Sequence, residues 1–167
     1  MADSKNQRVG IFVDVQNLYH TSKNLYKSRV NYSVLLKSLV RNRQLIRALA
    51  YVVKSDAATG EAAFFEALES AGLELRVKDL QIFPGGAKKG DWDVGMAVDA
   101  IRMAAGLDVV ILVTGDGDFV PLVEYLKWGG GKFVEVAAFK ETTSGRLQEA
   151  AENFTDLRVI KGILLKR

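Results

Sequence analysis

The chain has 167 residues, an ordinary apolar fraction of 49% and no cysteine. It is long enough for one domain with a real core, and it excludes disulfides, thiolate zinc sites and a cysteine nucleophile. The single histidine, His20, makes a histidine-rich metal site or a Ser-His-Asp triad hard to build, and the net charge of +3 permits a polyanionic partner without requiring one.

The N-terminal segment and the hydropathy favour a cytoplasmic protein. Residues 1–8 are polar and mixed in charge, unlike a signal peptide. No apolar stretch approaches the ~20 residues that a helix needs to cross a bilayer. We therefore expect a cytoplasmic protein with no membrane partner.

Strand-like and helix-like patterns alternate along the chain. Runs of β-branched and aliphatic residues predict strands, and apolar residues spaced three and four apart predict helices. In chain order we expect strand 8–14, helix 15–26, helix 32–41, strand 45–53, helix 60–70, strand 73–77, a loop at 83–90, helix 93–105, strand 108–114, helix 119–127, strand 132–139, helix 144–153 and strand 157–160. The alternation predicts an α/β fold, a three-layer α/β/α sandwich around a mostly parallel sheet. No repeat or linker divides the sequence, so we expect one domain over residues 1–167 with its core at about 8–160.

Aspartates follow the two runs that read most clearly as buried strands. The run 9–13 ends directly at Asp14, and the run 109–113 is followed by the turn that carries Asp116 and Asp118. The carboxyl ends of parallel strands meet at the sheet edge where such folds bind their ligands. Acidic oxygens gathered there repel one another unless a hard cation such as Mg²⁺ joins them. The sequence therefore predicts a metal-dependent acidic site.

Each of these carboxylates also has a purely structural interpretation. Asp14 and Asp118 can each cap the helix that follows. Asp93 stands in a first helical turn, where the helix dipole favours a negative charge. Asp99 has Arg102 three residues further on, and this spacing favours an ion pair over a metal ligand. Spacing alone leaves both interpretations open.

Polar residues near these positions are further candidates. Asn17 lies about one helical turn after Asp14, so both side chains can point at one spot above the sheet edge. Lys88 and Lys89 lie in a glycine-rich turn and are suited to contact a phosphate backbone, although lysine-rich loops are usually just solvated. His20 can line the same site at the sheet edge, but a lone exposed histidine more often has no role.

Three blocks of sequence, taken together, resemble a known family. They are residues 13–17 (VDVQN), 89–99 (KGDWDVGMAVD) and 114–119 (TGDGDF). In this order they look like the signature blocks of the LabA-like NYN domains, a branch of the PIN-like nuclease superfamily. The segment 130–136 and the helix that ends near residue 154 also fit, so the resemblance covers about residues 8–159.

The resemblance implies a PIN-like fold with five to six strands in the order 3-2-1-4-5. In that order the strands that precede Asp14 and Asp116 are neighbours, so the two carboxylates converge. Independent helix caps have no reason to converge, and this argues against a purely structural interpretation of both residues. The positions that match the family's catalytic, metal-binding acidic residues are Asp14, Asp93, Asp116 and Asp118. Asn17 matches the family's polar partner residue, and Thr114 matches the small hydroxyl residue beside the acidic pair.

One block departs from the family pattern. The family runs Lys-Gly-any-Asp, whereas residues 89–93 here carry one extra residue. Either Asp91 or Asp93 can then be the ligand, and the register of the following helix favours Asp93. Asp99 also falls in this block, without a defined role.

The function that the resemblance implies is that of a metal-dependent ribonuclease. One or two Mg²⁺ or Mn²⁺ ions held by the aspartates would promote hydrolysis of RNA phosphodiester bonds, a chemistry that needs neither cysteine nor histidine. Lys88, Lys89, Asn17 and Thr114 are the expected substrate-binding residues. The alternative is an RNA-binding or protein-binding regulatory domain with weak or no catalysis. The resemblance leaves open whether the site holds one or two ions and whether the substrate is RNA or DNA. It also leaves open whether the protein forms a homodimer.

Two other enzyme classes also place paired aspartates after a strand. Toprim-type DNA enzymes carry an Asp-any-Asp pair, but they expect a glutamate after the first strand, where Asp14 stands here. Haloacid dehalogenase-type phosphatases need Asp-any-Asp at the first strand, and the segment 14–16 lacks the second aspartate. The lone Asp14 argues against both classes.

Overall fold

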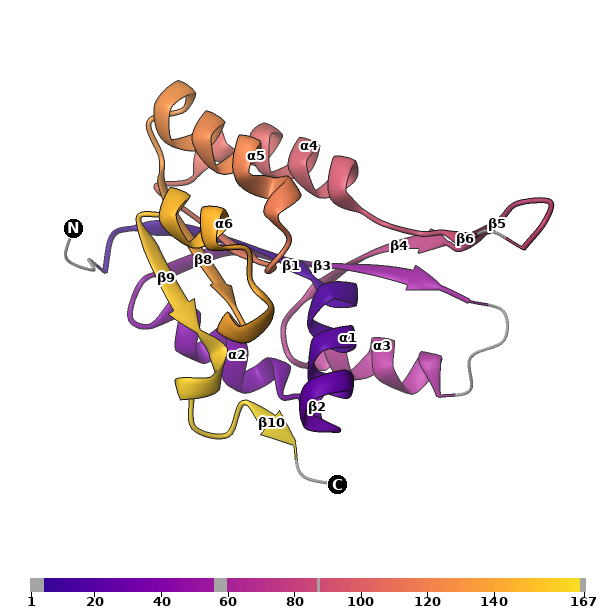
Figure 1. The fold of residues 1–167 in the computed structure, drawn as a ribbon. Helices are drawn as coiled ribbons and strands as arrows, with labels where there is room; N and C mark the ends of the chain where they lie inside the picture. The colour runs from indigo at the N-terminus through magenta and orange to yellow at the C-terminus, as the bar shows by residue number, and fades with distance from the viewer. Residues whose placement is uncertain (1–4, 56–59, 87, 166–167) are drawn as a thin grey trace.

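A six-stranded parallel sheet forms the centre of the structure, a computed structural model that describes residues 5–55, 60–86 and 88–165 (Figure 1). In sheet order the strands are β4 (Glu74–Asp79), β3 (Gln44–Lys54), β1 (Arg8–Asp14), β7 (Val109–Val113), β8 (Phe133–Ala138) and β9 (Asn153–Asp156). Every neighbouring pair is parallel. Counted along the chain, this is the predicted order 3-2-1-4-5 with a sixth strand added at the β8 edge.

Helices cover both faces of the sheet (Figure 1). One core lies against α1 (Val15–Tyr26), α2 (Tyr32–Val40) and α3 (Glu61–Ser70). The second core lies against α4 (Asp93–Met103), α5 (Val120–Glu124) and α6 (Gly145–Ala150). Strand β1 supplies both cores alternately, with Ile11 in the first and Phe12 in the second. The predicted three-layer α/β/α sandwich is therefore confirmed.

The strands in the middle of the sheet are apolar throughout because both of their faces are covered. All five residues of β7 are buried, and so are the residues from Val9 to Val13 in β1. Each fully buried Val or Ile side chain contributes about 1.5–3 kcal/mol relative to an exposed one. Strong burial fixes these two strands side by side, and with them the loops that leave their carboxyl ends.

The C-terminal elements differ from the prediction. The helix expected over 144–153 ends at Ala150, and the strand expected over 157–160 lies earlier, at Asn153–Asp156. Residues Leu157–Val159 instead form a 3₁₀ turn, in which the Asp156 carboxylate caps the N–H of Arg158 at 3.0 Å. Pairing with β8 draws the segment 153–156 into the sheet and overrides the local helical periodicity.

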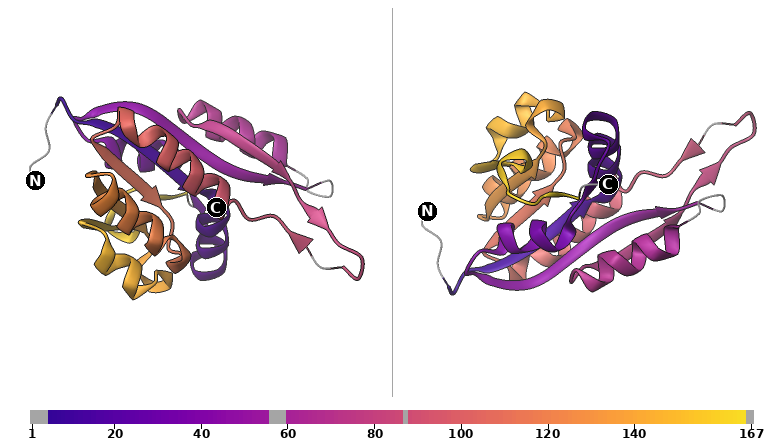
Figure 2. Two further views of the ribbon diagram at one scale, coloured as in Figure 1. Left: turned by 90° about the horizontal axis from the view of Figure 1, so that it is seen from above. Right: turned by 90° about the horizontal axis from the view of Figure 1, so that it is seen from below.

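The glycine-rich segment predicted as a loop forms a two-stranded hairpin. Its strands are β5 (Gln81–Ile82) and β6 (Lys88–Lys89), which pair antiparallel. Gly85 and Gly86 have positive φ angles of 96° and 89°, a backbone conformation that glycine adopts at little cost. The hairpin extends away from the sheet and helices (Figures 1 and 2).

The remaining elements are short. Strand β2 (Arg29–Val30) pairs with β10 (Leu164–Leu165), and the helix expected over 119–127 consists of a 3₁₀ turn at Gly117–Phe119, α5, and a π-turn at Tyr125–Gly129. Within the described part of the chain, no helix has the length and apolarity required to span a bilayer.

Candidate metal centre

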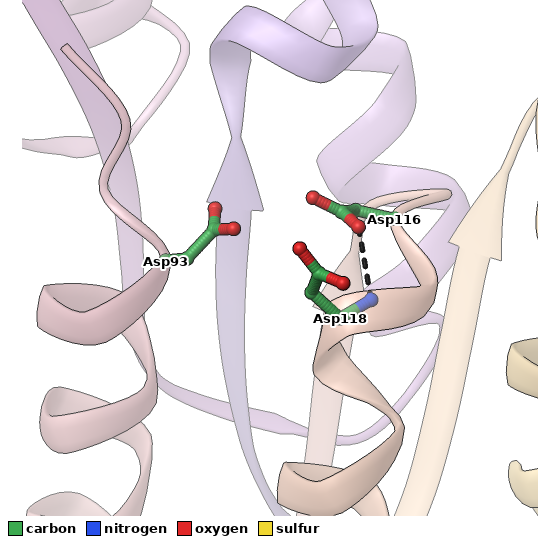
Figure 3. Close-up of side chains that lie close together, drawn as sticks. All are labelled: Asp93, Asp116 and Asp118. Atoms are coloured by element: carbon green, nitrogen blue, oxygen red, sulfur yellow. Dashed lines mark hydrogen bonds between the residues drawn. The ribbon is translucent and has the colours of Figure 1, made fainter. Parts of the chain in front are cut away.

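Three carboxylates converge at the carboxyl edge of the sheet (Figure 3). Asp93 is the first residue of α4, and Asp116 and Asp118 belong to the turn that follows β7. One oxygen from each of the three lies within 4.8 Å of the others. Asp116 Oδ1 also accepts the backbone N–H of Asp118 at 2.9 Å, which holds the Asp116 side chain against the turn. We call Asp93, Asp116 and Asp118 the acidic cluster.

The electrostatics of the acidic cluster favour a bound cation. Burial, followed by the negative charges of Asp116 and Asp14, raises the pKa of Asp93 to about 6. Carboxylates this close resist ionising together, and a divalent cation removes that penalty. Carboxylate oxygens are the hard ligands that Mg²⁺ and Mn²⁺ accept. The residues present therefore fit such an ion.

Asp14 lies beside the acidic cluster with both of its oxygens engaged. Oδ1 accepts the N–H of Asn17 at 3.2 Å and caps α1, and Oδ2 accepts the hydroxyl proton of Thr114 at 3.0 Å. Burial raises the pKa of Asp14, and these two hydrogen bonds act in the opposite direction. The predicted cap is thus present, and each carboxylate oxygen keeps a second lone pair that a cation can use.

Hydrogen bonds from Thr114 and Asn17 fix the loop that carries Asp116. Thr114 is fully buried, and its hydroxyl oxygen accepts the N–H of Asp116 at 3.2 Å while donating to Asp14. Asn17 Oδ1 accepts the N–H of Gly115 at 2.9 Å. Thr114 and Asn17, which are predicted to bind substrate, therefore use their side-chain oxygens to join β1 and β7 and to position the loop 114–118. We call residues 114–118 the acidic loop.

The acidic loop also rests on residues that the sequence did not single out. A side chain at Gly117 would meet Ser144, with its Cβ 2.8 Å from Ser144 Oγ. A side chain at Gly115 would likewise meet Thr143, with its Cβ 2.9 Å from Thr143 Oγ1. The N–H of Ser144 donates to the Gly115 carbonyl at 3.0 Å. Glycine is needed at these positions for close packing against the segment 143–144, a contact that no pattern in the sequence indicates.

Trp92 anchors the segment that leads into the acidic cluster. Its Nε1 donates to the Val52 carbonyl at 2.8 Å, and its ring meets the Tyr51 ring edge-on at 5.5 Å. Asp91 is exposed, accepts the N–H of Asp93 at 3.4 Å and lies outside the acidic cluster. Of the two candidate ligands in the second sequence block, the structure thus brings Asp93 into the acidic cluster and leaves Asp91 outside it.

Asp99 is a buried residue of α4 and is not one of the carboxylates of the acidic cluster. The Tyr51 hydroxyl donates to Asp99 at 2.8 Å, Arg76 lies 3.3 Å away, and Arg102 lies 3.7 Å away. The predicted pairing with Arg102 is present. Tyr51 and Arg76 are distant in sequence, so no spacing pattern indicated them.

The remaining predicted residues lie outside the acidic cluster. Lys88 and Lys89 form β6, four residues or more before Asp93, and their side chains are not part of the described structure. His20 is exposed on α1 and lines a pocket with Tyr19 on the α3 side of that helix.

Comparisons with known proteins identify a family and similar chains. The model of the NYN domain family matches residues 8–159. The "Low amplitude and bright protein LabA" of Synechococcus elongatus is 23% identical over 170 residues, which cover 95% of this chain and 88% of that protein. A crystal structure of a protein of unknown function, VPA0982 from Vibrio parahaemolyticus, has a TM-score of 0.88 and 34% identity, and covers 99% of this chain and 100% of its own. The family match contains all three sequence blocks and has the extent, residues 8–159, that the resemblance predicts.

Proposed function

We propose, from the premise that the chain belongs to the NYN domain family, that it is a metal-dependent nuclease that hydrolyses RNA phosphodiester bonds at the acidic cluster. The observation that carries the proposal is the convergence of Asp93, Asp116 and Asp118 within 4.8 Å at the carboxyl edge of the sheet. Asp14 is proposed as a fourth acidic group of the same site, because its negative charge is among those that raise the pKa of Asp93.

The chain's own residues have two tasks in this proposal. Asp93, Asp116 and Asp118 would hold Mg²⁺ or Mn²⁺, which when bound supplies activation of water and neutralises charge on the leaving oxygen. Thr114 and Asn17 keep the acidic loop fixed through their hydrogen bonds, so the site needs little reorganisation during the reaction. Without a cation, the clustered negative charges would repel a phosphodiester.

The phosphate backbone requires positive charge outside the acidic cluster. Lys88 and Lys89 lie in β6 of the projecting hairpin, and the chain runs directly from β6 to Asp93. We propose that these two lysines contact backbone phosphates, a role that positions RNA without reading its sequence.

Neutralising single carboxylates tests the proposal. Asp93→Asn and Asp116→Asn are each expected to lower the cleavage rate of an end-labelled single-stranded RNA in Mn²⁺ by about 100-fold or more, because each removes a ligand charge. The matched control is Glu149→Gln, which removes one exposed carboxylate on α6 and should leave the rate unchanged. An unchanged rate in both aspartate variants would overturn the nuclease proposal.

The same experiment distinguishes the regulatory alternative. A wild-type protein that binds RNA in Mn²⁺ without cutting it would be an RNA-binding domain rather than a nuclease. Binding is measured in parallel with cleavage, by the fluorescence anisotropy of the same RNA.

A further inference from the structure

A concave site opens between α1, α3 and the end of β3, and Val15, the residue after Asp14, lines it. It is a pocket of about 440 Å³, within the range typical of small-ligand sites. Its lining includes four ring side chains, Tyr19, His20, Phe64 and Phe65. We call these four residues the aromatic pocket.

Tyr19 brings an exposed ring to the wall of the aromatic pocket. Its ring packs against Phe64 with centroids 6.4 Å apart and an angle of 59° between the planes, and edge-on against His20 with centroids 5.7 Å apart. Tyr19 is 41% exposed, although its side chain is large and largely apolar. Exposed aromatic faces of this kind bind unstacked bases, because every nucleobase has a π-face that can stack on them.

Cations surround the mouth of the aromatic pocket. Arg29 lines it, and the Lys23 ammonium lies 5.6 Å from the centre of the Tyr19 ring. Across the described residues, neither side chain forms an ion pair with a carboxylate. Glu61, the acidic residue of the lining, accepts the N–H of Ser55 at 3.1 Å. Arg29 and Lys23 therefore supply positive charge that complements a phosphate, while the Glu61 carboxylate is held by the backbone of Ser55.

Helix α1 connects the aromatic pocket to the acidic cluster. Asn17 contacts Gly115 of the acidic loop, while Gln16 and Tyr19 line the pocket between α1 and α3. Because Asp14 and the pocket-lining Val15 are consecutive residues, a chain bound at the acidic cluster has the pocket within reach of a nearby nucleotide.

We propose that the aromatic pocket binds one unpaired nucleobase of a single-stranded RNA, next to the phosphate that is cleaved. Tyr19 stacks on the base, and Arg29 and Lys23 contact the adjoining phosphates. A base inside a duplex is already stacked and paired, so it cannot enter. The inference rests on the proposed nuclease function and narrows its substrate to single strands.

The test measures binding without cleavage. Short single-stranded RNA oligonucleotides, each with one abasic position, are titrated by anisotropy in Ca²⁺, and a gel confirms that they stay intact. Loss of one base–aromatic stack costs about 1–3 kcal/mol, which corresponds to a Kd about 5- to 140-fold weaker. We expect this loss for Tyr19→Ala with intact RNA and for one abasic position with wild-type protein. Tyr19→Phe keeps the ring and should bind as wild type does.

Combining the two changes gives the specific signature. If Tyr19 stacks on the base that the abasic position lacks, Tyr19→Ala should add no further loss with that oligonucleotide. Tyr125→Ala removes an exposed aromatic ring from the α5 side of the protein and should not change Kd. Thermal unfolding of each variant confirms that it is folded.

The outcomes separate the aromatic pocket from the nuclease proposal. The inference is overturned if Tyr19→Ala binds like wild type, if all abasic positions cost the same, or if a duplex binds as tightly as the single strand. Each of these results is compatible with cleavage that depends on Asp116. Conversely, the wild-type protein can fail to cleave RNA while Tyr19→Ala and the abasic position still give losses that do not add. That result would overturn the nuclease proposal and support the aromatic pocket as a base-binding site.

Discussion

Thr114 and Asp14 join the ends of the two central strands through one hydrogen bond of 3.0 Å. The same Thr114 oxygen accepts the N–H of Asp116 at 3.2 Å. One buried hydroxyl group therefore sets the position of two acidic residues that lie 102 positions apart in the chain. The geometry of the candidate metal centre depends on this side chain, although it does not belong to the acidic cluster itself.

Removing this hydroxyl should destabilise the protein and loosen the site. Thr114→Val preserves the shape of the side chain but leaves Asp14 Oδ2 and the Asp116 N–H without their partner. We expect the free energy of unfolding in urea to fall by about 1–3 kcal/mol. Mn²⁺ affinity, measured by calorimetry, should fall as well, because Asp116 is no longer held.

Thr114→Ser is the matched control, since it retains the hydroxyl group. It should keep most of the Mn²⁺ affinity of the wild type. If Thr114→Val matches the wild type in both urea midpoint and Mn²⁺ affinity, the hydrogen bonds of Thr114 do not support the site.

The raised pKa of Asp93 predicts a pH-dependent stability in the metal-free protein. The folded-state pKa is about 6 and the ordinary value is 3.8. The folded protein therefore holds this proton more tightly than the unfolded chain, so the free energy of unfolding falls as the pH rises from about 4 to above 6. Asp93→Asn lacks this titration and should be the more stable protein above pH 6.

Thermal unfolding in EDTA measures this difference. Because Asp93 is only half-buried, solvent screening limits the expected gain at pH 8 to about 1 kcal/mol. The two proteins should converge below pH 4, where Asp93 is protonated in both the folded and the unfolded state. A wild type that equals the variant at pH 8 would show that the clustered charges do not destabilise the fold.

The parts of the site that could be predicted are those fixed by strand ends. Asp14 and Asp116 follow strands whose uninterrupted apolar runs indicated burial on both faces, and β1 and β7 are indeed neighbours in the sheet. The strand order came from the family resemblance rather than from periodicity, which carries no information on which strands pair. Asp93 came from the same source, and the structure brings it to within 4.8 Å of Asp116 and Asp118.

Contacts between distant segments could not be predicted in the same way. The segment 153–156 joins the sheet because β8 offers it an open edge, and helical spacing gives no sign of that edge. The aromatic pocket combines Tyr19 of α1 with Phe64 of α3, two rings that are 45 positions apart and meet only after the helices pack. Phe64 lies in the helix predicted over residues 60–70 from its apolar periodicity, and that periodicity does not distinguish a core residue from a residue that lines a pocket.

Asp99 offers a test of structural against metal-binding roles in the second sequence block. It is buried, accepts the Tyr51 hydroxyl proton at 2.8 Å and is not one of the carboxylates of the acidic cluster. Asp99→Asn should therefore lower the free energy of unfolding by about 1–3 kcal/mol while leaving Mn²⁺ affinity intact. Tyr51→Phe, which removes the donor, should have the same pattern. A large loss of Mn²⁺ affinity in a folded Asp99→Asn protein would place Asp99 at the metal centre.

Gly95 controls the position of Trp92 at the entrance to α4. A Cβ at Gly95 would lie 2.7 Å from Cζ3 of Trp92 and would also overlap Cε3. The indole cannot move away freely, because its Nε1 donates to the Val52 carbonyl at 2.8 Å. Gly95→Ala should therefore displace the ring, at a cost of about 1–3 kcal/mol for overpacking. Since Asp93 is the next residue after Trp92, we expect Mn²⁺ affinity to fall too.

Tryptophan fluorescence reports this displacement directly. The chain has two tryptophans, and Trp128 is 81% exposed, so Trp128→Phe leaves Trp92 as the single emitter. In that background Gly95→Ala should shift the emission to longer wavelength as the indole loses its buried partners. Gly106→Ala is the control, because a Cβ there meets nothing within 4 Å. An unshifted spectrum together with unchanged Mn²⁺ affinity would show that the helix absorbs the added methyl group without moving Trp92, and that the close contact with Gly95 does not position Asp93.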